Sequence, residues 1–251
     1  MQQGTARSLV TITCRTALIL ASGSAIRQQM LKEVGLRFSV IPSGVDEEAL
    51  KPTLSHLSVT AQALALAKAK ALWVSEKNPD ALTIGADQIC SRILNSSLEG
   101  ESKSVQRNSV EGHLTNHTPH TLTTFAGSPS RGELEVIIFD KPGSHEKAEA
   151  HLAALAGKTH NQTNGLVITK GKDILWEHTA QATLTMRALT AAEIKTYIAA
   201  DAPLSSCGAY KLESLGRHLF ERIEGDHDVI KGLALTPLLT ELHRMGAISL
   251  I

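Results

Sequence analysis

The stretch from Thr16 to Gly35 constrains the fold more than any other part of this sequence. An apolar run at residues 17–21 leads into the small residues 22–24, and apolar residues then recur at helical spacing until Gly35. This order predicts a strand, a tight turn and a helix. Unpaired N–H groups and the positive end of the helix dipole lie at such a turn. The stretch therefore suits an anion, phosphate first of all.

Three side chains of this stretch could contact such an anion. Ser22 and Ser24 would supply hydroxyl groups and Arg27 a fixed positive charge. In the alternative interpretation Ser24 only caps the helix and Arg27 is a solvated surface residue. The stretch by itself leaves both interpretations open.

Composition excludes several classes of protein. A chain of 251 residues, 42% of them hydrophobic, can bury a substantial core. Lys plus Arg and Asp plus Glu both number 25, so net charge provides no basis for binding nucleic acid or an anionic membrane. The three cysteines lie far apart without CxxC spacing, which argues against a disulfide framework and a cysteine zinc site. With no signal-length or membrane-length apolar run, we expect a soluble, cytoplasmic protein.

The chain also contains segments of unusual composition. We expect residues 1–15 to form a loose extension before the first strand. At about residues 92–133 the composition shifts to Ser, Thr, Asn, His and Gly, which is typical of a low-complexity insertion that buries too little to order itself. Histidines at 113, 117 and 120 could suggest a metal site, but a polar, mobile loop is the preferred interpretation.

Hydrophobic periodicity and capping residues predict the remaining elements. Helices are expected from Thr60 to about Val74, after a cap at Ser144, after a capping box at Thr190–Glu193, and from Thr236. Strands are expected at residues 38–41, 81–90, 134–139 and 182–186, in a hairpin around 170–172, and in short pieces around 208–212 and 218–223.

Asp87 interrupts the apolar run at residues 81–90. Burying an unpaired carboxylate is costly, so Asp87 in a strand calls for a metal, a cation or a role in proton transfer. The alternative is that Asp87 stands at the end of the strand and caps the next turn.

Other charged residues allow two interpretations each. Glu47 belongs to an acidic group after a predicted strand, where it could hold a metal or simply open a helix. Lys70 lies in a predicted helix with Lys68, where lysines are usually solvated. Lys141 lies on a loop between strand and helix and is stiffened by Pro142, which favours a phosphate contact.

A series of short motifs runs through the chain in a definite order: ASGSAIR at 21–27, VDE at 45–47, AKA at 69–71, GADQ at 85–88, KP at 141–142, YKLE at 210–213, LFERIEG at 219–225 and GL at 232–233. In this order they resemble the Maf family of nucleoside triphosphate pyrophosphatases. The agreement covers about residues 17–246, the insertion excepted. The collinear order is a strong signal although each motif by itself is weak.

The resemblance implies an α/β fold with a long mixed central sheet, flanking helices and two lobes around a cleft. One Maf-like domain would span residues 16–251, interrupted by the insertion, and a homodimer is possible. The implied activity is hydrolysis of a nucleoside triphosphate to the monophosphate and pyrophosphate with a divalent metal, Mg²⁺, Mn²⁺ or Co²⁺. Such enzymes remove modified nucleotides.

The resemblance also assigns roles to individual residues. Asp87 would accept a proton from water and lie near the metal, with Glu47 as the second carboxylate. The positively charged residues would neutralise the triphosphate and its leaving group, and two serines would hold phosphate oxygens: Arg27, Lys70 and Lys141, with Ser22 and Ser24.

Residues 208–222 look more like the branch that hydrolyses 7-methyl-GTP than the branch that acts on dTTP and UTP. The latter has Ile-Gln-Gly where this chain has Leu-Glu-Ser at 212–214, and Gln88 points the same way. Glu213 could favour a positively charged base such as N7-methylguanine. The alternatives are a dTTP or UTP pyrophosphatase and a non-catalytic, nucleotide-binding regulator of septum formation.

Three positions depart from the family pattern. Gln28 stands where many members have a second basic residue, and Ala234 where proline is usual. Ser214 replaces a usual glycine, which would cost about 1 kcal/mol or more if that position required a positive φ.

Overall fold

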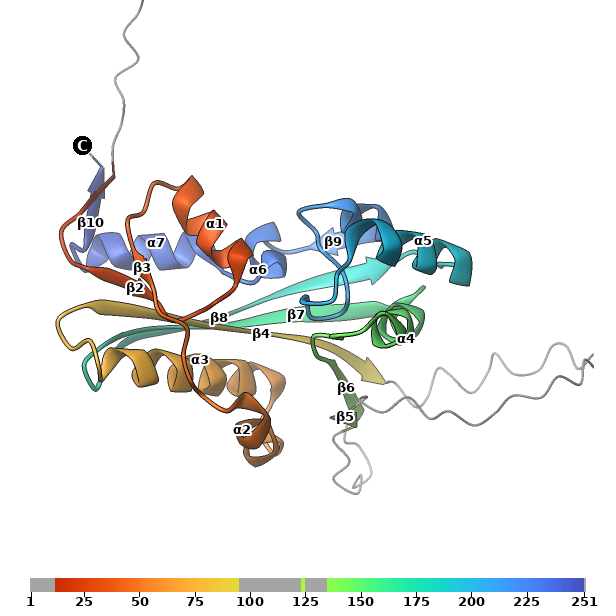
Figure 1. The fold of residues 1–251 in the computed structure, drawn as a ribbon, viewed down its shortest axis with the longest axis horizontal. Coiled ribbons are helices and arrows are strands. Elements are labelled where there is room, and N and C mark those ends of the chain that lie inside the picture. The colour runs from red at the N-terminus through yellow and green to blue at the C-terminus, as the bar shows by residue number, and fades with distance from the viewer. Residues whose placement is uncertain (1–11, 95–122, 125–134, 251) are drawn as a thin grey trace, which may run out of the picture. The chain divides into compact units, whose positions relative to one another are not determined.

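The computed structural model describes residues 12–94, 123–124 and 135–250 (Figure 1). Its helices are α1 (Ala25–Glu33), α2 (Glu47–Leu54), α3 (Val59–Ser75), α4 (His145–Leu155), α5 (Ala191–Asp201), α6 (His227–Lys231) and α7 (Leu235–Arg244), with a short 3₁₀ helix, η2, at Leu215–Leu219. Its strands are β1 (Ile12–Cys14), β2 (Leu18–Leu20), β3 (Ser39–Val40), β4 (Leu82–Leu94), β5 (Thr123–Thr124), β6 (Glu135–Phe139), β7 (Thr159–Lys170), β8 (Asp173–Met186), β9 (Phe220–Glu224) and β10 (Ile248–Leu250).

Within the described ranges, eight strands form one mixed sheet. Its main order is β3-β2-β4-β7-β8-β9, while β6 pairs with β4 and β5 with β6. Strand β2 is parallel to β3 and β4, whereas β4 with β6 and β8 with β9 are antiparallel. The predicted α/β class with a mixed sheet and flanking helices is confirmed.

The chain divides into two compact units. The first comprises Met1–Gln88, Thr163–Gln181 and Asp226–Ile251, and the second Ile89–Gln162 and Ala182–Gly225. Strands β4, β7 and β8 each contribute residues to both units, so the units are not successive along the chain. The single domain at 16–251 and the cleft between two lobes stay predictions.

In the first unit, the Ala-rich helix α3 packs tightly against the sheet. A Cβ atom added at Gly85 of β4 would lie 2.4 Å from the Ala67 carbonyl oxygen, and one at Gly165 of β7 would lie 2.3 Å from that of Ala63. Because glycines face alanines here, the backbone of α3 lies directly against the backbone of the sheet. Helices α1, α6 and α7 lie on the opposite side of these strands (Figure 1).

The second unit contains a buried polar network beside its apolar core. The Nε2 atom of His160 lies 2.9 Å from the hydroxyl of Tyr210, and the side-chain amide of Gln162 donates to the same hydroxyl at 2.8 Å. Burial lowers the pKa of His160 to about 4. The neutral imidazole is therefore the form that this network accommodates.

The start of the chain differs from the expectation of a loose extension at residues 1–15. Strand β1 pairs antiparallel with β10, with Ile12 opposite Leu250. Three residues carry too little periodicity to reveal a strand whose partner lies at the other end of the chain. Residues 1–11 of that extension lie outside the described residues.

Most other predicted elements are present with small shifts. The hairpin around residues 170–172 is β7 and β8, the predicted capping box opens α5, and Ser144 caps α4. Helix α3 is capped by Ser58 rather than Thr60, because the Ser58 hydroxyl accepts from the Ala61 N–H at 3.3 Å. The insertion expected at about 92–133 begins later, since β4 continues to Leu94, and most of it lies outside the described residues.

The strand expected around residues 208–212 is wrong. Gly208 and Ala209 both have positive φ, 79° and 60°, and the segment turns instead of extending. The strand expected around 218–223 is β9, which follows directly after η2. In the part of the chain that the structure describes, no helix is long and apolar enough to cross a membrane.

Candidate active site

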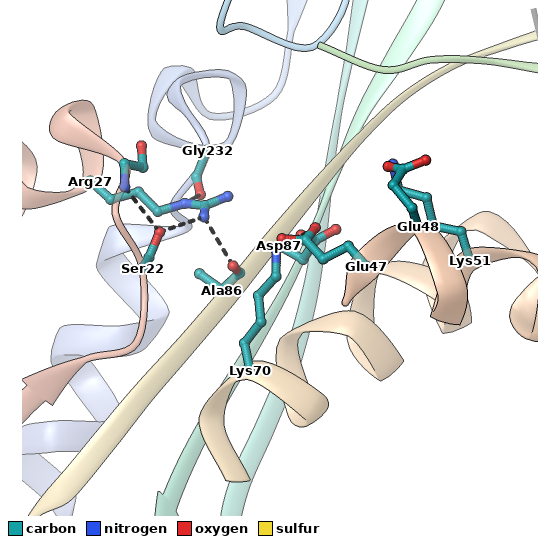
Figure 2. Close-up of polar contacts among 10 residues, drawn as sticks. Ser22, Arg27, Glu47, Glu48, Lys51, Lys70, Ala86, Asp87 and Gly232 are labelled. Atoms are coloured by element: carbon teal, nitrogen blue, oxygen red, sulfur yellow. Dashed lines mark hydrogen bonds and ion pairs between the residues drawn. The ribbon is translucent and has the colours of Figure 1, made fainter. Parts of the chain in front are cut away.

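Three charged side chains of the first unit meet at Lys70 (Figure 2). The Lys70 ammonium lies 2.6 Å from Oδ1 of Asp87 and 2.9 Å from Oε2 of Glu47. Lys70 comes from α3, Asp87 from the interior of β4 and Glu47 from the first turn of α2. The fold thus brings together three predicted site residues, and the alternative of a solvated Lys70 is wrong.

The position of Asp87 follows from strand alternation. Gly85 and Asp87 are two residues apart on β4 and point to the same side, toward α3. Asp87 is 6% exposed and lies within the strand, so the alternative of a strand-end cap is wrong. Burial raises the pKa of Asp87, and the neighbouring Lys70 opposes that rise. A carboxylate in such an environment is suited to proton transfer.

The three acidic residues at 46–48 have different roles. Asp46 opens α2, since its Oδ1 accepts from the Ala49 N–H at 3.1 Å. Glu47 turns to Lys70, whereas Glu48 pairs with Lys51 at 2.9 Å on the exposed side (Figure 2). The helix-opening interpretation therefore applies to Asp46, and metal binding by Glu47 stays a prediction.

The turn after β2 is organised by Arg27, which is 8% exposed. Its Nη1 donates to Oγ of Ser22 at 3.1 Å and to the Ala86 carbonyl at 2.9 Å, and its Nε donates to the Gly232 carbonyl at 2.7 Å (Figure 2). The alternative of a solvated Arg27 is wrong. Ser24 stands at the N-cap position of α1, but its side chain makes no capping hydrogen bond. Contact of these residues with phosphate stays a prediction.

Gln88 has a structural role that sequence reasoning missed. Its side-chain amide donates to the carbonyls of Val229 at 3.1 Å and Ile230 at 2.8 Å. The partners lie about 140 positions away in sequence. No local pattern around Gln88 could have revealed them.

Lys141 and Glu213 belong to the second unit, and both are exposed. Their roles at the site stay predictions. The strain considered for Ser214 is absent because its φ is −129°, and its hydroxyl instead donates to Oδ1 of Asp201 at 2.7 Å. Ala234 has φ −70°, an ordinary value that proline also adopts.

Metal binding by Asp87 and Glu47 stays a prediction, and their two carboxylates are of the kind that Mg²⁺ uses. Among the described residues no group of three or more His, Cys, Asp or Glu side chains could hold a metal on its own. Mg²⁺ is commonly bound by one or two carboxylates together with phosphate oxygens and water. The histidines at 113, 117 and 120 lie outside the described residues.

Comparisons with known proteins identify the family of this chain. The family model described as "Maf-like protein" matches residues 17–245. The chain is 33% identical over 233 residues to a protein of Legionella pneumophila named nucleoside triphosphate pyrophosphatase, covering 93% of this chain and 96% of the relative. It is 37% identical over 235 residues to a protein of Mesorhizobium japonicum named 7-methyl-GTP pyrophosphatase, covering 92% and 97%.

A Brucella abortus protein that is also named 7-methyl-GTP pyrophosphatase is 36% identical over 231 residues, covering 90% of this chain and 95% of the relative. The family match spans Lys70, Asp87 and Glu47 and nearly the whole of the described structure. On the extent of this match, the chain belongs to the Maf family.

Proposed function

We propose that this protein hydrolyses a nucleoside triphosphate to the monophosphate and pyrophosphate in the cytoplasm, with 7-methyl-GTP as the favoured substrate. The observation that carries the proposal is the placement of Lys70 between the carboxylates of Asp87 and Glu47. The names of the Legionella and Mesorhizobium relatives support the same reaction.

In the proposed reaction Asp87 takes a proton from water. The water oxygen forms a bond to the α-phosphorus, and the bond from that phosphorus to the α,β-bridging oxygen breaks, so pyrophosphate leaves. Lys70, which lies beside Asp87, would neutralise negative charge on the triphosphate. Ser22 and Arg27 would border the triphosphate at the turn after β2.

Asp87 and Glu47 would hold the divalent metal, Mg²⁺, Mn²⁺ or Co²⁺. When bound, it would supply positive charge to the phosphate oxygens and the leaving group. Glu47 is the more accessible of the two carboxylates, with 38% of its side chain exposed against 9% for Asp87. Glu47 therefore has more of its surface open to a ligand than Asp87 has.

The test is pyrophosphate release from 7-methyl-GTP, GTP, dTTP and UTP, with Mg²⁺ or Mn²⁺ present. Asp87→Asn should lower kcat by about 100-fold or more because an amide cannot accept the proton. Asp46→Asn is the matched control, since asparagine also caps helices and should leave activity near the wild-type value.

Each outcome of this assay decides one part of the proposal. A preference for dTTP or UTP would overturn the substrate, full turnover by Asp87→Asn would overturn the base, and no turnover with any nucleotide would overturn the reaction. If EDTA left the activity unchanged, the metal would be excluded.

We also propose that Glu213, which is exposed, sets the substrate preference. A carboxylate attracts a positively charged base such as N7-methylguanine more than the neutral base of GTP. Glu213→Gln should reduce the ratio of kcat/KM for 7-methyl-GTP to that for GTP. Glu221→Gln on β9 removes an exposed charge from the same unit and serves as the control. An unchanged ratio in Glu213→Gln would refute this role.

A further inference from the structure

Gln88 links β4 to the carboxyl end of α6 within the first unit. Neighbouring strand residues point to opposite sides of a sheet. Asp87 points toward Lys70, so Gln88 points to the other side of β4, toward α6. Its amide nitrogen donates to the carbonyls of Val229 and Ile230 in the last turn of α6. Carbonyls at a helix end lack the partners that they would have inside the helix. The Val229 carbonyl also accepts from the Gly232 N–H at 3.1 Å, so Gln88 adds a further donor there and provides one to the Ile230 carbonyl.

The same helix end also holds Arg27. Gly232 ends α6 with φ 105°, and its carbonyl accepts from Nε of Arg27 at 2.7 Å. A Cβ atom at Gly232 would lie 3.2 Å from Oε1 of Gln88 and 3.5 Å from Nε of Arg27. Gln88 and Arg27 therefore both donate hydrogen bonds to the short segment Val229–Gly232.

We propose that Gln88 is a positioning residue for triphosphate binding. It fixes the Val229–Gly232 segment, and the Gly232 carbonyl then sets the orientation of the Arg27 guanidinium beside Ser22. Since an N–H donor is directional, a shift of Gly232 would weaken the bond from Nε and change the orientation of a guanidinium whose Nη1 also donates to Ser22 and Ala86. The inference rests on the proposed function, because it takes the turn after β2 to be the phosphate site.

The chemistry of the side chain makes this role specific. The amide of Gln88 provides two N–H donors to two carbonyls. A glutamate at position 88 would set a charged acceptor against those carbonyls, and a methionine would remove both side-chain donors and leave the Val229 carbonyl with the Gly232 N–H. Either change should release the α6 end without touching Asp87 or Lys70.

The experiment measures binding of inorganic triphosphate with Mg²⁺ by calorimetry, which needs neither base recognition nor hydrolysis. Gln88→Met should weaken binding about tenfold, which corresponds to loss of roughly one hydrogen-bond energy in orientation. With 7-methyl-GTP it should raise KM with little change in kcat. Gln88→Glu should weaken binding at least as strongly.

Gln62→Met is the matched control. Gln62 is a buried glutamine of the same unit that donates from its amide to the Leu57 carbonyl at 2.8 Å. Both methionine variants should lower the melting temperature, but only Gln88→Met should weaken triphosphate binding. If the two variants bind inorganic triphosphate equally well, Gln88 is only structural and the proposal is overturned.

A double-mutant cycle tests the route through Arg27. In an Arg27→Lys background, which removes the Nε–H donor to Gly232, Gln88→Met should have little further effect on triphosphate binding. Full additivity would overturn the route. Gln88→Asn keeps both donors on a shorter side chain and replaces Gln88→Met if the latter does not fold.

The proposed function can fail separately. If wild-type protein binds inorganic triphosphate but hydrolyses no nucleotide, the reaction is wrong and the comparison of Gln88 with Gln62 still decides the positioning role. If wild-type protein binds no inorganic triphosphate, the positioning role is overturned even where hydrolysis is observed.

Discussion

Lys70 shows how burial makes one lysine differ from its neighbour two positions away. Its side chain is 10% exposed and contacts both Asp87 and Glu47, whereas Lys68 is 33% exposed and pairs with Glu177 at 2.8 Å. Removing one partner of a buried ion pair leaves an uncompensated charge, while an exposed pair contributes little. The two residues therefore form a matched pair for experiment.

Lys70→Met should lower the free energy of unfolding by about 3 kcal/mol, because Asp87 and Glu47 would then face each other without a cation. Lys68→Met should lower it by less than about 1 kcal/mol. Urea denaturation of both variants beside wild type measures the difference. Equal losses would contradict the buried ion pair.

At the scale of elements, packing of α3 on the sheet depends on two glycines. Gly165→Ala should destabilise the protein by about 1–3 kcal/mol, since the new Cβ atom would meet the Ala63 carbonyl oxygen at 2.3 Å. Gly23→Ala is the control, because there the Cβ atom would lie 3.7 Å from Pro42, an ordinary contact. Thermal unfolding of the two variants separates them, and a Gly165→Ala protein as stable as wild type would refute the close approach.

Helix α5 tests how much of a helix is specified locally. Its capping box has the Thr190 hydroxyl accepting from the Glu193 N–H at 3.2 Å while the Glu193 carboxylate accepts from the Thr190 N–H at 2.8 Å. Thr190→Ala should cost about 1 kcal/mol. Thr196→Ala removes only a hydroxyl bonded to the Ala192 carbonyl inside the same helix and should not destabilise it. Denaturant midpoints that fall equally would contradict the capping role.

For the whole molecule, the buried His160 predicts loss of stability in acid. Its pKa is about 4 in the folded protein, against 6.5 for an unperturbed histidine, so between these values the unfolded chain binds more protons. Stability therefore falls as the pH drops through this window, by about 3 kcal/mol from this group. In His160→Gln the fall in unfolding free energy between pH 7 and pH 4 should be smaller by that amount. Parallel curves for the two proteins would show that His160 does not titrate on unfolding.

The sequence alone was enough to predict the elements that local chemistry specifies. The strand, turn and helix from Thr16 to Gly35, the capping box of α5 and the hairpin of β7 and β8 follow from periodicity, caps and turn residues within about 15 positions. Asp87 stood out because a carboxylate within an apolar run requires a partner, and the structure contains one. The motifs identified the family because their order along the chain is part of the sequence itself.

Only the tertiary structure decided which side chains meet. Lys70 had the pattern of a solvated lysine until α3 placed it against Asp87, and the partners of Gln88 and Arg27 on α6 lie far from both in sequence. The pairing of β1 with β10 and the turn at Gly208 and Ala209 likewise depend on distant segments. Periodicity and capping act over a few residues, so the sequence by itself determined the elements and the chemistry that they carry. Contacts between distant segments depend on how the chain packs, and packing set the partners of Lys70, Arg27 and Gln88.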